Sequence, residues 1–207
     1  MFFFNSSDNF LTYLITDGET TADNFAEKKS RILELVTIAA ENNISLIQIR
    51  EKKLPARLVF ELVREAAEIT RKSQTKILVN DRADIAFAAK AAGVHLTSHS
   101  LSAEIIRRNF PKDFVIGVST HTIETSETAK QNGADFVTFG PIFETPDKGK
   151  PHGVEKLHEV CEKLKPFPVI ALGGIDETNY KSVLENGARG FAAIRFLNNI
   201  ENFKRFF

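Results

Sequence analysis

Polar side chains end several short apolar segments of this chain, and one of them is well suited to bind an anion. The segment 46–50 ends in Arg50, and Gln48 lies on the same face because side chains alternate along a strand. A guanidinium in that position could bind a phosphate or carboxylate ligand. The alternative is an internal ion pair of Arg50 with Asp81 or Glu51, because a buried charge needs a partner. We favour ligand binding.

The segment 76–79 leads into Asn80 and Asp81, whose side chains offer oxygen atoms. Magnesium is usually held by one or two carboxylates, while substrate phosphates and water complete its shell. Asp81 is therefore a candidate Mg²⁺ ligand. The alternative is an Asx-type cap on the helix that follows, which is a common role of both residue types.

Histidine and serine residues occur at two further segment ends. His121 follows the segment 114–118 together with Ser119, and an imidazole placed there could transfer a proton near neutral pH. For Ser119 the alternative is to cap the next helix. A zinc site from His95, His99 and His121 is conceivable, but its spacing matches no standard zinc pattern.

Residues 139–153 form a long stretch rich in glycine, proline and charge. Long loops in compact domains are usually functional or disordered. We interpret this one as a mobile lid that presents Thr145 and Lys148 to an anion. Gly173 and Gly174 follow another apolar segment, and paired glycines let a phosphate approach the backbone amides.

The elements that must position these residues alternate along the whole chain. Short apolar runs suit buried strands, and longer stretches with apolar residues three and four apart suit amphipathic helices. The pattern predicts an α/β fold, a (β/α)8 TIM barrel of minimal size that forms a single domain over residues 1–207, with an open doubly wound sheet as the alternative. In such a barrel the loops after the strands carry the active site, which is where the polar residues fall. The predicted strands are 11–15, 46–50, 76–79, 94–96, 114–118, 136–139, 169–172 and 190–194, and the predicted helices are 28–42, 56–73, 84–91, 103–109, 123–132, 154–164, 177–186 and 199–207.

Composition argues against several classes of protein. The 27 Lys and Arg residues balance 27 Asp and Glu residues, so no net charge favours nucleic acid or an acidic membrane as a partner. No apolar run approaches the roughly 18 residues that a membrane span requires. The apolar start 1–4 lacks a basic leader and does not read as a signal peptide. Cys161 is the one cysteine and suits a buried position, so we expect a reducing, cytoplasmic location.

The chain resembles the thiamine phosphate synthase and TenI-type thiazole tautomerase superfamily over about residues 11–197. The motifs that carry the resemblance are short, but their order and spacing make it specific. They are Gln48-Ile49-Arg50-Glu51-Lys52, Val79-Asn80-Asp81-Arg82, Gly93-Val94-His95-Leu96, Gly117-Val118-Ser119-Thr120-His121, Gly133-Ala134-Asp135-Phe136-Val137, Phe139-Gly140-Pro141-Ile142-Phe143 and Ala171-Leu172-Gly173-Gly174-Ile175.

The resemblance implies a transferase that joins hydroxymethylpyrimidine diphosphate to thiazole phosphate with loss of magnesium pyrophosphate. Its partners would be small phosphorylated molecules, and a homodimer is left open. The resemblance assigns the diphosphate to Gln48, Arg50, Lys52 and Asn80, magnesium to Asp81, the pyrimidine or leaving group to Ser119, both phosphates to Thr145 and Lys148, and the thiazole phosphate to Gly173, Gly174 and Arg195.

Three positions differ from the synthase pattern. Ser100 replaces a second magnesium carboxylate, Asp147 replaces a lid threonine, and Arg195 replaces a serine at the thiazole phosphate site. The first two are similar to TenI-type relatives, in which a histidine matching His121 would move a proton during thiazole isomerisation. We therefore predict a synthase-like transferase, with a TenI-type tautomerase or a non-catalytic binder of thiamine intermediates as alternatives.

Overall fold

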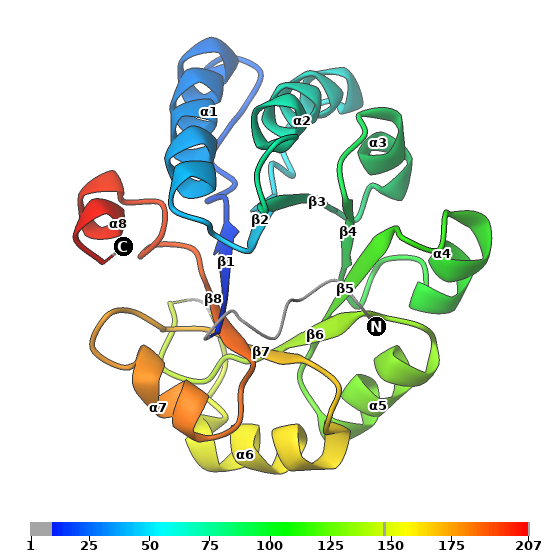
Figure 1. The fold of residues 1–207 in the computed structure, drawn as a ribbon, viewed down its shortest axis with the longest axis vertical. Helices are drawn as coiled ribbons and strands as arrows, with labels where there is room; N and C mark the ends of the chain where they lie inside the picture. The colour runs from blue at the N-terminus through cyan, green and yellow to red at the C-terminus, as the bar shows by residue number, and fades with distance from the viewer. Residues whose placement is uncertain (1–9, 147, 207) are drawn as a thin grey trace. The chain divides into compact units, whose positions relative to one another are not determined.

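The computed structural model describes residues 10–146 and 148–206. Within them, eight strands alternate with eight helices (Figure 1), and the strands pair in chain order, β1 to β8, as a closed barrel. The predicted (β/α)8 barrel is thus confirmed, and the open doubly wound sheet is not what forms. None of the helices in the described ranges is long and apolar enough to cross a membrane.

The bounds of the elements follow the predicted ones closely. The strands are β1 (Leu11–Ile15), β2 (Leu46–Ile49), β3 (Lys76–Asn80), β4 (Gly93–Leu96), β5 (Val115–Thr120), β6 (Phe136–Phe139), β7 (Val169–Leu172) and β8 (Gly190–Ala193). The helices are α1 (Phe25–Glu41), α2 (Ala56–Thr70), α3 (Ala83–Ala88), α4 (Ala103–Asn109), α5 (Ile123–Gln131), α6 (Gly153–Leu164), α7 (Tyr180–Glu185) and α8 (Ile200–Phe206).

The chain divides into two compact units, which we describe separately. The first unit comprises the described residues up to Thr12 with Leu96–Asn109 and Ile116–Ala193. The second unit comprises Tyr13–His95, Phe110–Val115 and the described residues from Ile194 onward.

In the second unit, β2 is the fully buried central strand. It pairs in parallel with β1 and β3, and Ile47 lies opposite Leu14 and Ile77. A strand that is apolar on both faces is typical of a parallel sheet covered by helices. Helices α1 and α2 pack beside one another (Figure 1). The buried residues of α2 are three and four apart, which accounts for its helical pattern in the sequence: Val59, Leu62, Val63, Ala66 and Thr70.

In the first unit, β6 is buried along its whole length and pairs in parallel with β5 and β7. Helix α6 packs against α5 and α7 (Figure 1) and buries Leu157, Val160, Cys161 and Leu164. Burial raises the pKa of the Cys161 thiol to about 12, so it stays protonated and packs as a small apolar group. The expected buried cysteine is confirmed.

Several boundaries differ from those predicted by up to three residues, and two of these differences have a reason in the hydrogen bonds. β5 continues to Thr120, because Ser119 and Thr120 still pair with Thr138 and Phe139 of β6. α7 begins three residues later than predicted. The side chain of Asp176 accepts hydrogen bonds from the backbone N and the hydroxyl of Thr178, at 2.9 and 2.6 Å, and this turn takes the place of the first helical turn.

Candidate active site

The carboxyl ends of β2 and β3 bring five predicted site residues onto two adjacent strands of the second unit. Ile49 pairs with Val79, so Arg50 and Asn80, the next residues, continue at the same edge. Arg50 and Asn80 are half-buried, whereas Lys52 and Asp81 are exposed. This edge therefore combines two cations, a carboxamide and a carboxylate.

Gln48 lies deeper in the second unit, within a buried chain of hydrogen bonds. Its Nε2 donates to the Tyr13 hydroxyl at 3.1 Å, and that hydroxyl lies 3.1 Å from Nδ1 of His95. Burial lowers the pKa of His95 to about 3, partly offset by the negative charge of Asp81, so the ring is neutral at pH 7. The Tyr13 hydroxyl thus accepts from Gln48, and it can donate to Nδ1 of His95 when the ring hydrogen is on Nε2.

The hydrogen bonds that Tyr13 makes with Gln48 and with His95 could not be predicted from the sequence. Tyr13 stands in the middle of an apolar run and has the appearance of an ordinary core residue. His95 drew attention only as a member of a conceivable zinc site. The structure buries it with 2% of its surface exposed and places Nδ1 against the Tyr13 hydroxyl. More generally, no group of three or more His, Cys, Asp or Glu side chains able to hold a metal occurs in the described ranges.

Asn80 and Asp81 do not cap helix α3. The residue at its N-cap is Arg82, and no side chain makes a capping hydrogen bond there. Asn80 Nδ2 instead donates to Asp81 Oδ2 at 2.6 Å. The backbone of Asp81 is left-handed, with φ of +60°, a conformation uncommon for a residue with a side chain and enriched at functional sites.

Arg50 takes part in none of the ion pairs among the described residues, which excludes the predicted partners Asp81 and Glu51. Its backbone N donates to Thr16 Oγ1 at 2.8 Å. The alternative of an internal ion pair is therefore not what forms among the described residues, and ligand binding by the Arg50 guanidinium stays a prediction.

The end of β5 presents Ser119 and His121 in the first unit. Ser119 Oγ accepts a 3.4 Å hydrogen bond from Thr138. It does not cap α5, because that role belongs to Thr122. His121 Nδ1 lies 2.5 Å from the carbonyl oxygen of Gly140. A carbonyl can only accept, so Nδ1 carries the hydrogen and Nε2 of the neutral ring can accept a proton.

A second imidazole, His152, lies near His121 and was missed from the sequence. Its ring stacks on Phe139 with centroids 5.0 Å apart. Burial lowers the pKa of His152, the positive charge of His121 lowers it further, and a hydrogen bond to Gly140 opposes both. The available signal was its place directly before helix α6, at the end of the predicted lid.

The loop between β6 and α6 contains the two predicted lid residues. Thr145 Oγ1 donates to the Phe143 carbonyl at 3.1 Å, and the backbone N of Lys148 donates to the Thr145 carbonyl at 3.2 Å. Lys148 is exposed, and Thr145 is half-buried. Asp147 lies outside the described residues. The role of this loop as a lid stays a prediction.

Gly173 and Gly174 have a structural reason to be glycine. A Cβ at Gly173 would lie 2.6 Å from Pro141 Cα, and one at Gly174 would lie 2.6 Å from the Glu144 carbonyl oxygen. Their φ angles are +104° and +66°. The pair thus lets the loop after β6 pack closely, and phosphate binding by these glycines stays a prediction. Arg195, after β8, is exposed.

Comparison with known proteins places the chain in a family. The family model described as thiamine monophosphate synthase matches residues 12–197. The chain belongs to the thiamine monophosphate synthase family. The thiamine-phosphate synthase of Clostridium novyi (strain NT) is 37% identical over 189 residues, which cover 90% of this chain and 89% of that relative.

Two further relatives agree. The thiamine-phosphate synthase of Caldanaerobacter subterraneus subsp. tengcongensis is 34% identical over 189 residues, covering 90% of this chain and 85% of the relative. The solved structure of thiamine phosphate pyrophosphorylase from Pyrococcus furiosus superimposes with a TM-score of 0.82 at 29% identity, covering 95% of this chain and 91% of that one.

Magnesium, which the thiamine monophosphate synthase family implies, has few protein ligands here. Asp81 is an exposed carboxylate, and the Asn80 amide contacts one of its oxygens. Ser100, at the position of a second carboxylate, has a hydroxyl that accepts from Thr97 N at 2.7 Å. This donor set suits a magnesium ion that arrives already bound to phosphates, because such ions need only one or two carboxylates.

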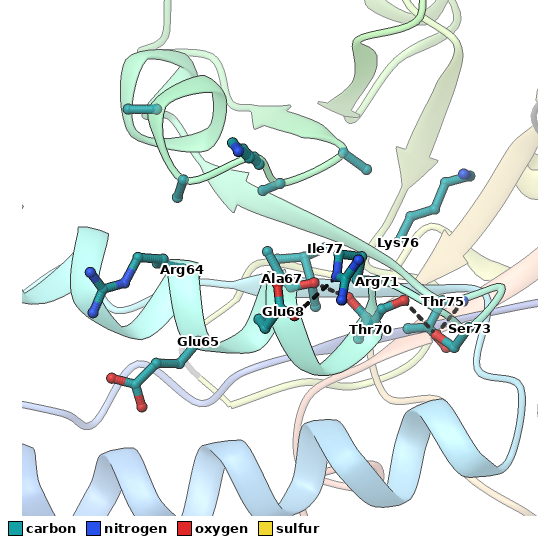
Figure 2. Close-up of a pocket in the computed structure, with 15 residues that line it drawn as sticks. Arg64, Glu65, Ala67, Glu68, Thr70, Arg71, Ser73, Thr75, Lys76 and Ile77 are labelled. Carbon is teal, nitrogen blue, oxygen red and sulfur yellow. Dashed lines mark hydrogen bonds and ion pairs between the residues drawn. The ribbon is translucent and has the colours of Figure 1, made fainter.

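A pocket of about 640 Å³ in the second unit lies away from the predicted site residues. It lies between the end of α2, the start of β3 and the residues after α3, with Lys76 and Ile77 at the start of β3 on its wall (Figure 2). Predicted site residues of this family are found at the opposite, carboxyl end of β3. None of the lining residues is among them.

Proposed function

We propose that this protein is a thiamine-phosphate synthase, which joins hydroxymethylpyrimidine diphosphate to thiazole phosphate and releases pyrophosphate. The observation that carries the proposal is the Arg50 guanidinium, which forms no ion pair within residues 10–146 and 148–206, at the same strand edge as Asn80 and Asp81. Membership of the family supports it, because relatives that match nearly the whole chain are named as synthases.

The reaction breaks the bond between the pyrimidine methylene carbon and the diphosphate oxygen. Negative charge builds on the departing diphosphate, and fixed positive charge lowers the energy of that state most where water is scarce. Arg50 and Lys52 supply two such charges. Asn80 donates its amide to Asp81 and would orient that carboxylate. Gln48, held by Tyr13, would contact the same substrate.

Magnesium would be held by Asp81 together with the diphosphate oxygens. When bound, the ion neutralises charge on the leaving group. Asp81 is prepared for this by its left-handed backbone, which the structure around it must hold in place against strain.

The residues of the first unit would bind the remaining groups. Ser119 would contact the pyrimidine or the leaving group, while Thr145 and Lys148 would close over the phosphates. Gly173 and Gly174 would take the thiazole phosphate, the ligand to which the resemblance also assigns Arg195. We also infer a cytoplasmic location, which the protonated, unpaired thiol of Cys161 supports.

The test is the formation of thiamine phosphate by the purified chain from both substrates with magnesium, separated by chromatography. We expect product only when both substrates are present. Arg50→Ala should weaken diphosphate binding by about 1.5–3 kcal/mol, the scale of a charge-assisted hydrogen bond. Absence of product under all conditions would contradict the proposal.

One observation favours a second function, isomerisation of the thiazole phosphate. The hydrogen on His121 Nδ1 is held by Gly140, so Nε2 is free of hydrogen in the neutral ring and could accept a substrate proton. Ser100 in place of a carboxylate agrees with a reaction that needs no metal. Proton exchange into thiazole phosphate in the absence of magnesium and diphosphate would support this function.

A further inference from the structure

The loop between β1 and α1, residues 16–24, is attached to the chain just after β2 at two points, the Arg50 backbone and the Glu51 side chain. Thr16 Oγ1 accepts a hydrogen bond from the Arg50 backbone N at 2.8 Å. The backbone N of Thr20 donates to Glu51 Oε2 at 3.1 Å. Gly18 stands between these two attachments along the chain.

Gly18 lies directly against Arg50. A Cβ on Gly18 would be 3.0 Å from Arg50 Nη1 and 3.0 Å from the Arg50 carbonyl oxygen. Its φ angle is +79°, in the left-handed region that favours glycine. The bare backbone of Gly18 thus forms the surface on which the guanidinium rests.

Glu51 makes the second attachment at a cost in stability. Only 4% of its surface is exposed, and Thr20 is fully buried. Glu51 Oε1 and Thr20 Oγ1 have no hydrogen-bond partner in the described part of the chain. Burial of a carboxylate with incomplete hydrogen bonding costs free energy, and an apolar side chain could fill the same space. Glu51 thus fixes the end of the strand to the loop through Thr20, although its burial does not favour the folded state.

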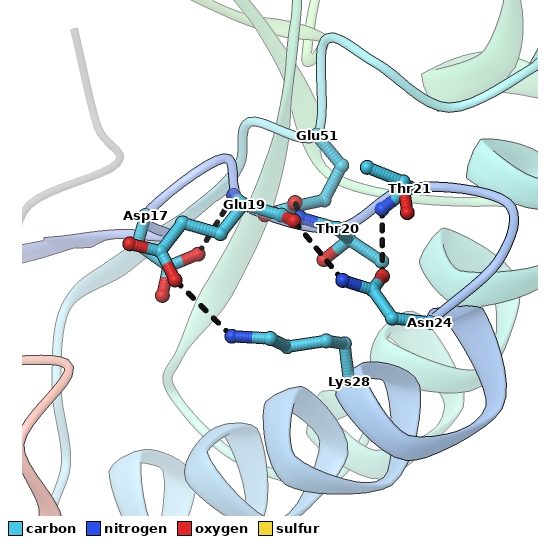
Figure 3. A network of polar contacts seen from close by, with 7 residues as sticks. All are labelled: Asp17, Glu19, Thr20, Thr21, Asn24, Lys28 and Glu51. Carbon is cyan, nitrogen blue, oxygen red and sulfur yellow. Dashed lines mark hydrogen bonds and ion pairs between the residues drawn. The ribbon is translucent and has the colours of Figure 1, made fainter.

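The loop is itself held firmly (Figure 3). Asp17 Oδ1 accepts from Glu19 N at 3.0 Å, and Asn24 Oδ1 accepts from Thr21 N at 2.7 Å. Lys28 reaches from α1 to the Glu19 carboxylate at 3.1 Å. A loop with these internal contacts can hold a neighbouring side chain in one place.

We propose that loop 16–24 is the positioning element for Arg50, with Gly18, Thr16 and Glu51 as its positioning residues. A carboxylate paired with Arg50 would orient the guanidinium but would compete with the anionic substrate. The Gly18 backbone instead limits where the guanidinium can lie, and the Thr16 hydroxyl fixes the Arg50 backbone; neither group carries a charge. The inference rests on the proposed function in taking the diphosphate as the anion that Arg50 binds.

Gly18→Ala tests the inference, with binding of inorganic pyrophosphate in the presence of magnesium measured by calorimetry. We expect the Kd to rise about tenfold, the value of roughly one charge-assisted hydrogen bond. Gly187→Ala is the matched control, because Gly187 has φ of +92° and a Cβ there would lie 3.0 Å from Cys161 Cβ. It should lower thermal stability similarly and leave the Kd unchanged.

Two further comparisons separate positioning from general damage. In an Arg50→Ala background, Gly18→Ala should cause no additional loss of pyrophosphate affinity, because the loop acts through Arg50. Glu51→Ala should raise the Kd, whereas Glu51→Gln, which keeps an oxygen for Thr20 N, should restore it. If Gly18→Ala does not fold, the comparison of Glu51→Ala with Glu51→Gln tests the inference instead.

The outcomes distinguish this inference from the proposed function. The inference on loop 16–24 would be overturned if Gly18→Ala lowered pyrophosphate affinity equally in the natural and the Arg50→Ala backgrounds. It would also be overturned if Gly18→Ala left the Kd unchanged, or if the natural chain did not bind pyrophosphate. The expected pattern of Kd values in a chain that forms no thiamine phosphate would support the inference and contradict the proposed function.

Discussion

At the scale of single residues, burial decides the chemistry of His95. The pKa of His95 falls to about 3 in the folded chain, from an ordinary value of 6.5. The unfolded chain therefore binds a proton between these pH values that the folded chain does not, and the free energy of unfolding rises with pH across this window. His95 destabilises the folded protein in acid and has no such effect above pH 6.5.

We predict that acidification from about pH 7 to about pH 5 lowers the free energy of unfolding by about 2 kcal/mol through His95. Urea unfolding at both pH values measures the change. The control is His95→Gln, which keeps an acceptor for the Tyr13 hydroxyl and cannot titrate. A variant that loses as much stability on acidification as the natural chain would show that His95 is not responsible.

His121 has a more exposed ring, and its role separates the two proposed functions. If it moves a proton during isomerisation, His121→Gln should lower that turnover by about 10²–10⁴-fold and leave thiazole phosphate affinity nearly intact. Isotope exchange into thiazole phosphate measures the first quantity and calorimetry the second. The isomerase function would be contradicted if His121→Gln still formed thiamine phosphate and neither the variant nor the natural chain exchanged isotope into thiazole phosphate.

At the scale of elements, Asp135 joins α4 to the strands of the first unit. Its Oδ2 accepts from Arg107 Nη2 and from the Ile116 backbone N, both at 2.7 Å, and Arg107 also donates to the Gly133 carbonyl. The two side chains are only 24% and 17% exposed. The Gly133-Ala134-Asp135 motif thus has a structural role within the loop that leads into β6.

We predict that Asp135→Ala lowers the free energy of unfolding by about 3 kcal/mol, because the partly buried Arg107 loses its carboxylate partner and the Ile116 backbone N loses its acceptor. The matched control is Glu68→Ala, which breaks the exposed pair with Arg71, whose side chains are 62% and 68% exposed, and should cost less than about 1 kcal/mol. Denaturant unfolding at neutral pH compares them. Equal losses in the two variants would contradict the structural role of Asp135.

Periodicity and burial made most elements predictable from the sequence. β6 and β7 begin and end as predicted, because each is a short apolar run between polar turns. The start of α7 was not predictable, since its Asp176 and Thr178 suit either a helix start or a turn, and only their hydrogen bonds decide. The site residues could be placed at strand ends, but the buried partners of Gln48 and the packing reason for Gly173 depend on contacts distant in sequence.

At the scale of the whole molecule, the family and the charge pattern both agree with the thiamine-phosphate synthase reaction. The chain balances its charges overall, so attraction of an anionic substrate depends on local groups such as Arg50 and Lys52. With Ser100 in place of a carboxylate, Asp81 is the charged ligand that we propose for magnesium. Magnesium should therefore bind weakly alone and mainly as its complex with the diphosphate.

The most direct test is thiamine phosphate formation across a magnesium titration for four chains. We predict a slow, magnesium-dependent synthase in the natural chain, no product from Asp81→Ala, and faster coupling at lower magnesium from Ser100→Asp. Asp113→Ala, which removes an exposed carboxylate after α4, should match the natural chain. A natural chain that forms no product at any magnesium level, and that Ser100→Asp does not rescue, would contradict the account.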